Sequence, residues 1–199
     1  MGEQDARVTR SRHLITTAVI DLIVDSGLHA VTVDAVVARS GVAKTTLYRH
    51  WPSREALLAD VLTTALPAQR APDTGSLEGD LRALARGLAG GLADERTAGL
   101  LAAIAFIDGD ATLDPIRQAA TRSRHTAVRE VVERARRRGE TIPTDGPDGL
   151  IRSIAGPLFY RRFVEGVPPT RTLADRCVTR ALSPTDHAAP DPAPLEATP

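Results

Sequence analysis

The sequence has a single cysteine, Cys177, among its 199 residues. One cysteine excludes an internal disulfide and a cysteine-rich zinc site, so we expect Cys177 to be a small apolar residue on a helix. Four of the five histidines are scattered, with neither i, i+4 pairing nor an acidic partner at ligand spacing: His13, His29, His125 and His187. The sequence therefore predicts no metal site.

Catalytic motifs are also lacking. The chain has no glycine-rich phosphate loop, no Gly-x-Ser-x-Gly turn and no His-Glu-x-x-His segment. Because no residues are available to carry catalysis, we expect a protein that is not an enzyme and that uses no cofactor.

Long apolar runs are missing, although 42% of the residues are hydrophobic. No stretch approaches the roughly 18 to 20 apolar residues of a membrane span. The first residues, MGEQDAR, contain no apolar segment of the signal-peptide type. We therefore expect a cytoplasmic chain without a membrane partner. No run alternates in the manner of a strand bounded by hairpin turns, which predicts an all-α fold.

The chain also lacks a net charge, since 25 lysines and arginines balance 25 acidic residues. This balance at first argues against a nucleic-acid partner. Residues 1–54, however, carry seven of the basic residues and five of the acidic ones, a local charge of +2 that leaves −2 for the remainder. Because binding depends on where cations lie on the surface, the zero total does not exclude DNA.

The first third of the chain predicts four helices. The segment from residue 9 to residue 26 has the spacing of an amphipathic helix, with Ile15, Ala18, Val19, Leu22 and Ile23 on one face. We expect Gly27 to end it with a left-handed backbone and Thr32 to cap the second helix. Pro52-Ser53 ends the third helix and starts the fourth, and residues 1–8 precede all four as a short polar arm.

The rest of the chain predicts further helices separated by loops rich in proline and glycine. A leucine stripe begins after Ser76, and helical spacing continues in 96–107, 114–138, 148–165 and 170–182. The residues after Ser183 are almost all Pro, Ala, Asp, Glu or Thr, which predicts disorder for 183–199. We therefore expect two helical domains, residues 1–66 and 76–182.

Residues 32–51 carry most of the functional information. Val33, Val36 and Val37 precede Gly41 at helical spacing, and Val42 and Leu47 follow it. Two short helices joined by a turn with glycine are typical of a helix-turn-helix, whose second helix enters the major groove. That second helix is crowded with groups that bond to phosphates or base edges: Lys44, Thr45, Thr46, Tyr48, Arg49 and His50.

Residues 12–62 resemble the DNA-binding domain of the tetracycline-repressor (TetR) family of bacterial transcriptional regulators. The resemblance rests on the ordered combination of RHLITTA from Arg12, Gly27, Thr32-Val33, and GVAKTTLYRHWPSREAL from Gly41. Three positions depart from the family's usual residues: Val37 for alanine, Trp51 for phenylalanine and Arg54 for lysine. The segment GPLFYRRF from Gly156 is similar to the dimer-forming region of one branch of the family.

The resemblance implies roles for individual residues. Tyr48, His50 and Arg54 are expected to contact phosphates, as is Thr32 at the amino end of the second helix, where exposed amides favour anions. From their chemistry, Lys44, Thr45, Thr46 and Arg49 are candidates for base or phosphate contacts. We expect Leu47 and Trp51 to belong to the core. Arg7, Arg10 and Arg12 are open to two interpretations, as an arm on the DNA or as a solvated terminus.

A homodimeric, ligand-responsive repressor on a palindromic operator is the function that the resemblance implies. Residues 148–182 would form the dimer interface, and an unknown small-molecule effector would bind among the middle helices. The candidate effector-binding residues are Phe106, Arg122, His125, Phe159 and Tyr160. Two alternatives are a DNA-binding dimer without an effector, and a helical enzyme or metabolite-binding protein with a vestigial DNA domain.

Overall fold

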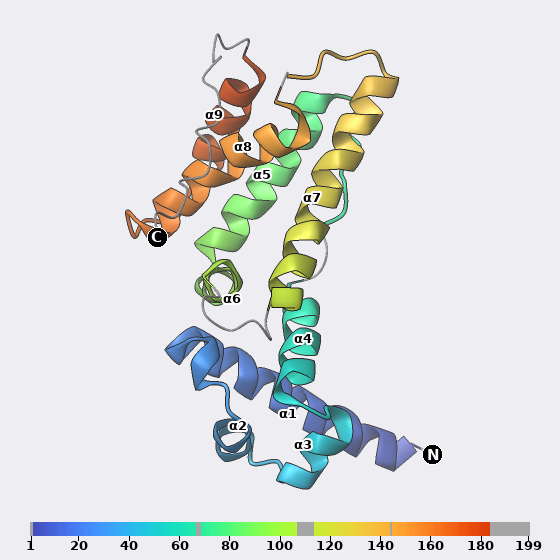
Figure 1. The fold of residues 1–199 in the computed structure, drawn as a ribbon, viewed down its shortest axis with the longest axis vertical. Helices are drawn as coiled ribbons and strands as arrows, with labels where there is room; N and C mark the ends of the chain where they lie inside the picture. The colour runs from blue at the N-terminus through green and yellow to red at the C-terminus, as the bar shows by residue number, and fades with distance from the viewer. Residues whose placement is uncertain (1, 67–68, 107–113, 144, 184–199) are drawn as a thin grey trace, which may run out of the picture.

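The computed structural model describes residues 2–66, 69–106, 114–143 and 145–183. These residues form α-helices and one short 3-10 helix, and no strand occurs among them, which confirms the all-α prediction. The helices form two bundles along the long axis of the molecule (Figure 1). The predicted disordered tail lies, apart from Ser183, outside the described residues.

The N-terminal bundle consists of α1 (Gly2–Ser26), α2 (Val33–Ser40), α3 (Lys44–His50) and α4 (Arg54–Ala65), with the 3-10 helix η1 (Leu28–Ala30) after α1. Its helix ends follow local chemistry. The hydroxyls of Thr32 and Ser53 accept hydrogen bonds from backbone amides three residues ahead and so cap α2 and α4. The core contains Ile15, Val19, Ile23, Val31, Val36, Leu47, Trp51, Leu57, Leu58 and Val61. Leu47 and Trp51 are thus core residues, as predicted.

Two predictions for this bundle need correction. The helix α1 begins at Gly2, so residues 2–8 belong to the first helix, where the sequence predicted a separate segment before it. Gly27 has the expected positive φ, 79°, but its ψ of 174° lies outside the left-handed helical region. Only glycine adopts this combination of φ and ψ readily. The prediction that a glycine ends the helix here therefore holds, although the turn has another geometry.

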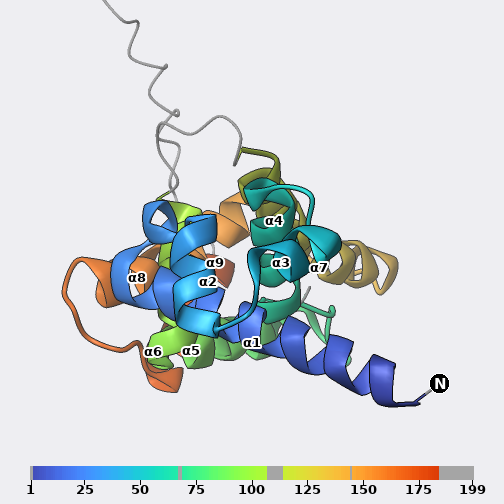
Figure 2. The same ribbon diagram turned by 90° about the horizontal axis from the view of Figure 1, so that it is seen from below.

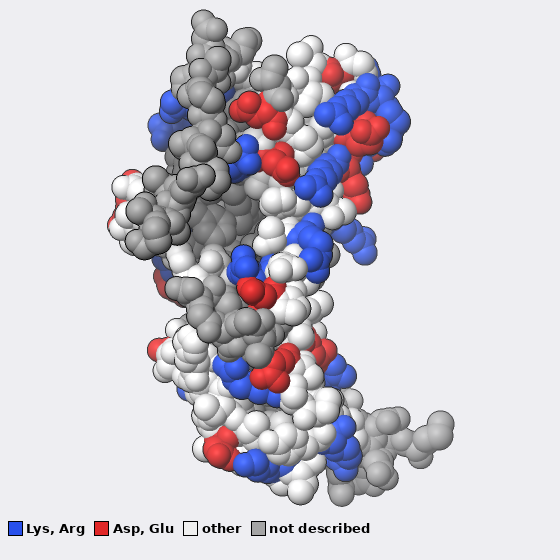
Figure 3. All heavy atoms as spheres, viewed as in Figure 1, with Lys and Arg blue, Asp and Glu red and all other residues white. Residues whose placement is uncertain are grey.

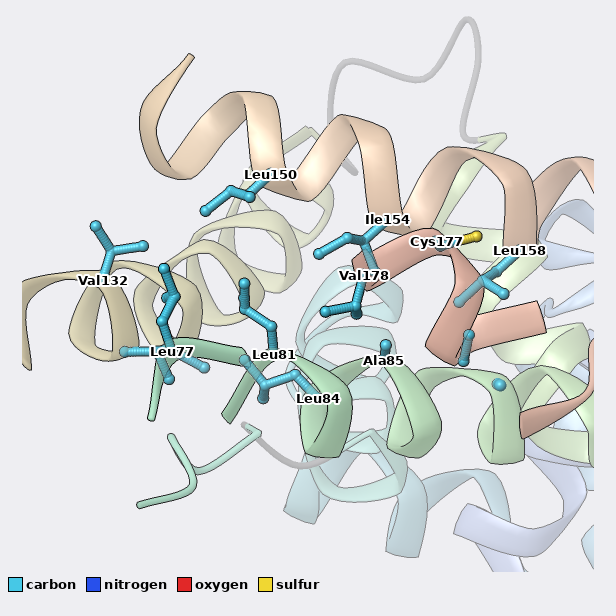
Figure 4. Close-up of a cluster of buried hydrophobic side chains, with 14 of the residues drawn as sticks. Leu77, Leu81, Leu84, Ala85, Val132, Leu150, Ile154, Leu158, Cys177 and Val178 are labelled. Atoms are coloured by element: carbon cyan, nitrogen blue, oxygen red, sulfur yellow. The ribbon is translucent and has the colours of Figure 1, made fainter. Parts of the chain in front are cut away.

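The C-terminal bundle contains α5 (Leu77–Ala93), α6 (Glu95–Ala105), α7 (Asp114–Arg137), α8 (Gly146–Phe163) and α9 (Arg171–Leu182). The leucine stripe of α5 packs against α7, α8 and α9, where Val132, Leu150, Ile154, Leu158 and Val178 meet it (Figure 4). Cys177 is buried in this core, as expected of a small apolar residue. Among the described residues, no helix is both long and apolar enough to cross a bilayer.

Asp80 anchors a polar network at one end of this bundle. Its side chain is fully buried. The Thr74 amide and hydroxyl donate to it at 2.6 and 2.8 Å, and Arg134 Nη2 donates at 3.3 Å. Burial pushes the pKa of Asp80 upward, but these hydrogen bonds outweigh it and leave the pKa below its ordinary value. The network fastens the loop before α5 to α7.

The helix α6 belongs to both bundles. Leu101 lies in the core of the C-terminal bundle, whereas Leu100 and Ile104 complete the core of the N-terminal one. A bridge of 2.8 Å joins Arg96 to Asp21 of α1. The two bundles are therefore joined by a shared apolar helix as well as by the chain between α4 and α5.

Candidate nucleic-acid interface

The helices α2 and α3 form the predicted helix-turn-helix. Gly41 joins them in the left-handed conformation, φ 67° and ψ 10°, and its amide donates to the Val37 carbonyl. No other residue adopts this backbone as cheaply. Viewed along the long axis, α2 and α3 lie on the outer end of the N-terminal bundle (Figure 2). This placement leaves the second helix of the motif accessible to a partner.

The candidate contact residues on α3 divide by exposure. Lys44, Thr45, Tyr48 and Arg49 are exposed, Thr46 and His50 are half-buried, and Leu47 is buried. Tyr48 is 46% exposed although it is a large aromatic residue. Because Leu47 holds one face of α3 in the core, the opposite face presents a cation, hydroxyls and a phenol together. Such a set bonds to phosphate oxygens and to base edges.

Lys44 is paired with Asp34 of α2. Its Nζ lies 2.9 Å from Asp34 Oδ1, and both side chains remain exposed, at 53% and 84%. The hydrogen bond to Asp34, reinforced by Coulombic attraction, raises the pKa of Lys44 above its ordinary value. The sequence analysis did not identify Asp34, because a pairing across the turn depends on how the two helices pack.

Thr32 combines two capacities at the amino end of α2. Its Oγ1 accepts from the Ala35 amide at 3.1 Å, which confirms the predicted cap. A hydroxyl also carries one donor, which the cap leaves available. Thr32 is exposed, so this donor is accessible to an anion at the helix end.

The carboxyl end of α3 is held by Trp51, Asp60 and Arg12. The Trp51 indole donates to Asp60 Oδ2 at 2.9 Å, and Arg12 Nη2 lies 3.0 and 2.8 Å from the two oxygens of Asp60. The Arg12 guanidinium also lies 5.6 Å from the centre of the Trp51 ring. These contacts tie α1, α3 and α4 together. Arg12 therefore has a structural partner, which favours neither earlier interpretation of it as a DNA arm or a solvated terminus.

Two residues that were predicted to contact phosphates also have contacts within the protein. Arg54 Nε and Nη2 donate to the Val31 and Leu28 carbonyls at 2.7 and 2.8 Å, which favours a role in fixing the chain between α1 and α2. His50 packs on Trp51 with ring centres 5.5 Å apart, and its Nε2 is buried. A phosphate contact by His50 would therefore use Nδ1.

The arginines near the start of α1 and those along α7 differ in their surroundings. Arg10 is exposed on α1, and the Arg7 side chain lies outside the described residues. Acidic partners bind five arginines of α7 and the one that follows it, namely Arg117, Arg129, Arg134, Arg136, Arg137 and Arg138. Basic and acidic side chains are interspersed over the face shown in Figure 3. This pairing indicates that α7 is a solvated, ion-paired helix.

The candidate effector residues fall into two groups. Phe106 at the end of α6 and Phe159 of α8 both contact Phe163, with ring centres 5.8 and 5.6 Å apart. His125 Nδ1 of α7 lies 3.6 Å from Asp148, while Arg122 and Tyr160 are exposed. Phe163 escaped the sequence analysis, and its spacing of four residues from Phe159 was the signal that could have identified it. Within the described ranges, no cluster of potential metal ligands occurs.

Comparison with protein families agrees with this geometry. Residues 15–61 match the family model described as bacterial regulatory proteins, tetR family. Residues 71–181 match the model of the tetracyclin repressor-like C-terminal domain. The two matches correspond to the N-terminal and C-terminal bundles.

Individual proteins extend the similarity over most of the chain. An uncharacterized HTH-type transcriptional regulator of Bacillus subtilis, YdeS, is 30% identical over 76% of this chain and 78% of its own length. The HTH-type transcriptional regulator AqdR of Rhodococcus erythropolis is 32% identical over 75% of this chain and 73% of its own.

Solved structures show the same fold. The regulator FadR of Bacillus subtilis, solved in complex with stearoyl-CoA, has a TM-score of 0.71 at 12% identity, covering 86% of this chain and 97% of that one. With the helix-turn-helix, both family models and these relatives in agreement, the chain belongs to the TetR family of DNA-binding transcriptional regulators.

Proposed function

We propose that the protein is a homodimeric repressor that binds a palindromic operator and is released from it by a small molecule. Two copies of α3 would enter successive major grooves about 34–36 Å apart. Lys44 and Thr46 would contact base edges, with Thr45 and Arg49 beside them, and Tyr48 and Thr32 would contact phosphates. The observation that carries the proposal is the exposed polar face of α3 opposite the buried Leu47.

The outer face of α8 supports a dimer interface within residues 148–182. Gly156 and Pro157 are exposed there, followed by Tyr160 and Val164, which are 56% and 66% exposed. A row of small and apolar residues at helical spacing suits close packing with a second copy. The exposed residues of α9 include Arg176, Thr179 and Arg180. The interface that we propose is therefore apolar along α8 and polar along α9.

The proposed effector site lies among α6, α7 and α8. Phe106 and Phe159 share Phe163 as a neighbour, so they offer a common aromatic surface. The stearoyl-CoA complex of FadR shows that a protein of this fold binds an apolar chain, which makes acyl compounds a first panel for testing. Arg122, His125 and Tyr160 stay candidates on the neighbouring helix surfaces. An effector that prefers a different helix arrangement would shift the population away from the operator-binding state.

Selection from random duplexes at moderate salt tests the DNA-binding proposal, and a palindrome should be enriched. With the enriched site in hand, Lys44→Ala should lose about 1–3 kcal/mol on that site and relax specificity at one position. Tyr48→Phe should weaken binding similarly on every sequence, because a phosphate carries no sequence information. Enrichment of no palindrome would favour the alternative, a helical enzyme or metabolite-binding protein with a vestigial DNA domain.

Titration of acyl compounds and other metabolites against operator affinity tests the effector. A ligand-dependent loss of affinity supports the proposal. No change across a broad panel favours the effector-independent regulator. Because a bacterial transcriptional regulator binds the chromosome, and the chromosome lies in the cytoplasm, we propose that this protein is cytoplasmic.

A further inference from the structure

Two exposed ion pairs each connect α2 to one of its neighbouring helices in the DNA-binding bundle. Lys44 Nζ of α3 lies 2.9 Å from Asp34 of α2, and Arg39 Nη2 of α2 lies 2.6 Å from Asp25 of α1. The pairs resemble each other in exposure and in linking neighbouring helices. They differ in their relation to the proposed DNA contacts, because only the first pair includes a residue of α3.

Asp34 has opposite effects on the helix and on an anionic partner. It lies in the first turn of α2, where a negative charge interacts favourably with the helix dipole. The same helix end, with Thr32 as its cap, faces the proposed phosphate contact. A carboxylate there repels phosphate and also neutralises the nearest cation. Asp34 therefore favours the helix and opposes DNA binding.

The pairing also restrains Lys44. Its ammonium group sits on a flexible four-carbon stem and has three donors. Asp34 occupies one donor and holds the group at the start of α3. Because Asp34 already neutralises Lys44, the lysine neutralises little of a phosphate's charge and displaces few of the counterions that surround the DNA. It therefore adds little to sequence-independent binding. At a guanine, the remaining donors still reach O6 or N7.

We propose that Asp34 is a specificity-determining residue, which keeps Lys44 from binding the backbone of any DNA and holds it for a base edge. This inference rests on the proposed function, since it requires that α3 binds DNA. Asp34 thereby lowers affinity for random sequence more than affinity for the operator. A regulator finds its operator among many competing sites through the ratio of its operator affinity to its affinity for random sequence.

The variant Asp34→Asn tests the inference, with the full-length dimer and fluorescent duplexes of random and selected sequence. Affinity for the random duplex should rise about twofold to fivefold per subunit, the range expected of an exposed ion pair. The plot of log affinity against log salt should steepen by about 0.9 for each phosphate gained. The selected duplex should gain less. The melting temperature should fall slightly, since α2 loses its first-turn acid, so stability and affinity should change in opposite directions.

Asp25→Asn is the matched control, because it removes the same charge from the other exposed pair. Asp34→Glu, which keeps the carboxylate, should restore the wild-type ratio of affinities. In a Lys44→Ala background, Asp34→Asn should raise affinity for the random duplex less than it does in the wild-type background, because only the direct repulsion of phosphate is then relieved. Equal effects of Asp34→Asn and Asp25→Asn would overturn the inference, as would weaker binding of Asp34→Asn to both duplexes. Failure of the proposed function is distinguishable, because the wild type would then select no sequence.

Discussion

Each of the two bundles holds a carboxylate with a basic partner, but the two carboxylates lie in very different surroundings. In the DNA-binding bundle, the pair Lys44–Asp34 bridges neighbouring helices in the open, with both side chains more than half exposed. In the C-terminal bundle, Asp80 is fully buried and held by Thr74 and Arg134. An exposed pair contributes little to stability, whereas a buried carboxylate is costly to disturb. The pair beside the proposed DNA contacts can therefore be changed at little cost in stability, whereas the buried network cannot.

Replacing Asp80 should have the largest effect. Asp80→Ala leaves Arg134 and the Thr74 donors without their buried acceptor, so the free energy of unfolding should fall by about 3–5 kcal/mol. Urea denaturation at fixed protein concentration measures it. The neighbouring Asp73, which is 64% exposed, provides the control, and Asp73→Ala should stay within about 0.5 kcal/mol. Equal losses for the two variants would contradict the contrast between buried and exposed acids.

Acid should weaken the C-terminal bundle by the same chemistry. The carboxyl groups of Asp80, Asp94, Glu140 and Asp175 all have lowered pKa values and all lie there. A carboxyl group whose pKa is lower when folded contributes stability above its unfolded pKa, near 4, and loses it as the pH falls through the folded value.

Stability should therefore be level above about pH 5 and decline below it. The decline should be smaller than the effect of Asp80→Ala, because a protonated carboxyl still forms hydrogen bonds. Denaturation between pH 3 and pH 7 measures it. In Asp80→Asn the decline should be shallower, and an unchanged profile would show that Asp80 does not contribute to it.

Trp51→Phe tests whether a directed hydrogen bond also matters in the DNA-binding bundle. The variant keeps an aromatic ring but removes the indole donor to Asp60, and it should cost about 1–2 kcal/mol of unfolding free energy. Asp60→Asn should cost less, because its amide oxygen still accepts from the indole. Thermal and urea unfolding of both variants give the comparison. Unchanged stability in Trp51→Phe would show that Trp51 contributes through packing alone and that its hydrogen bond does not matter.

A glycine pair tests the junction between the bundles and should give the smallest effect. Gly90 of α5 has open space where a Cβ would lie, so Gly90→Ala should gain up to about 1 kcal/mol from helix propensity. At Gly99 of α6 the added Cβ would meet Val24 Cγ2 of α1 at 3.2 Å. Gly99→Ala should therefore gain less than Gly90→Ala in matched unfolding experiments. An equal gain would mean that α1 and α6 adjust freely.

Local signals in the sequence were enough to predict much of the fold. The cap at Thr32, the turn at Gly41 and the burial of Leu47 and Trp51 each depend on a few adjacent residues, and all are confirmed. Helical spacing likewise identified the segments that became α5 to α9.

Contacts between distant residues could not be predicted in this way. Asp34 meets Lys44, and Asp60 meets Trp51 and Arg12, only because the helices pack at particular angles. The same is true of Arg54. The family usually has lysine at this position, which predicted a phosphate contact, but the Arg54 guanidinium donates to the Leu28 and Val31 carbonyls. The roles of charged side chains were thus harder to assign than the helices that carry them.

The shared helix α6 limits how far the two halves of this regulator are interchangeable. Leu100 and Ile104 lie in the second half of the chain yet fill the core of the first. A DNA-binding unit excised at residue 66 would expose the apolar surface that these two side chains cover, and should self-associate. Likewise, a chimera that gives this N-terminal unit a foreign C-terminal domain should fold well only if the donor supplies apolar residues at these two positions. The boundary between the two bundles therefore runs along a face of α6 and does not coincide with the loop that follows α4 in the sequence.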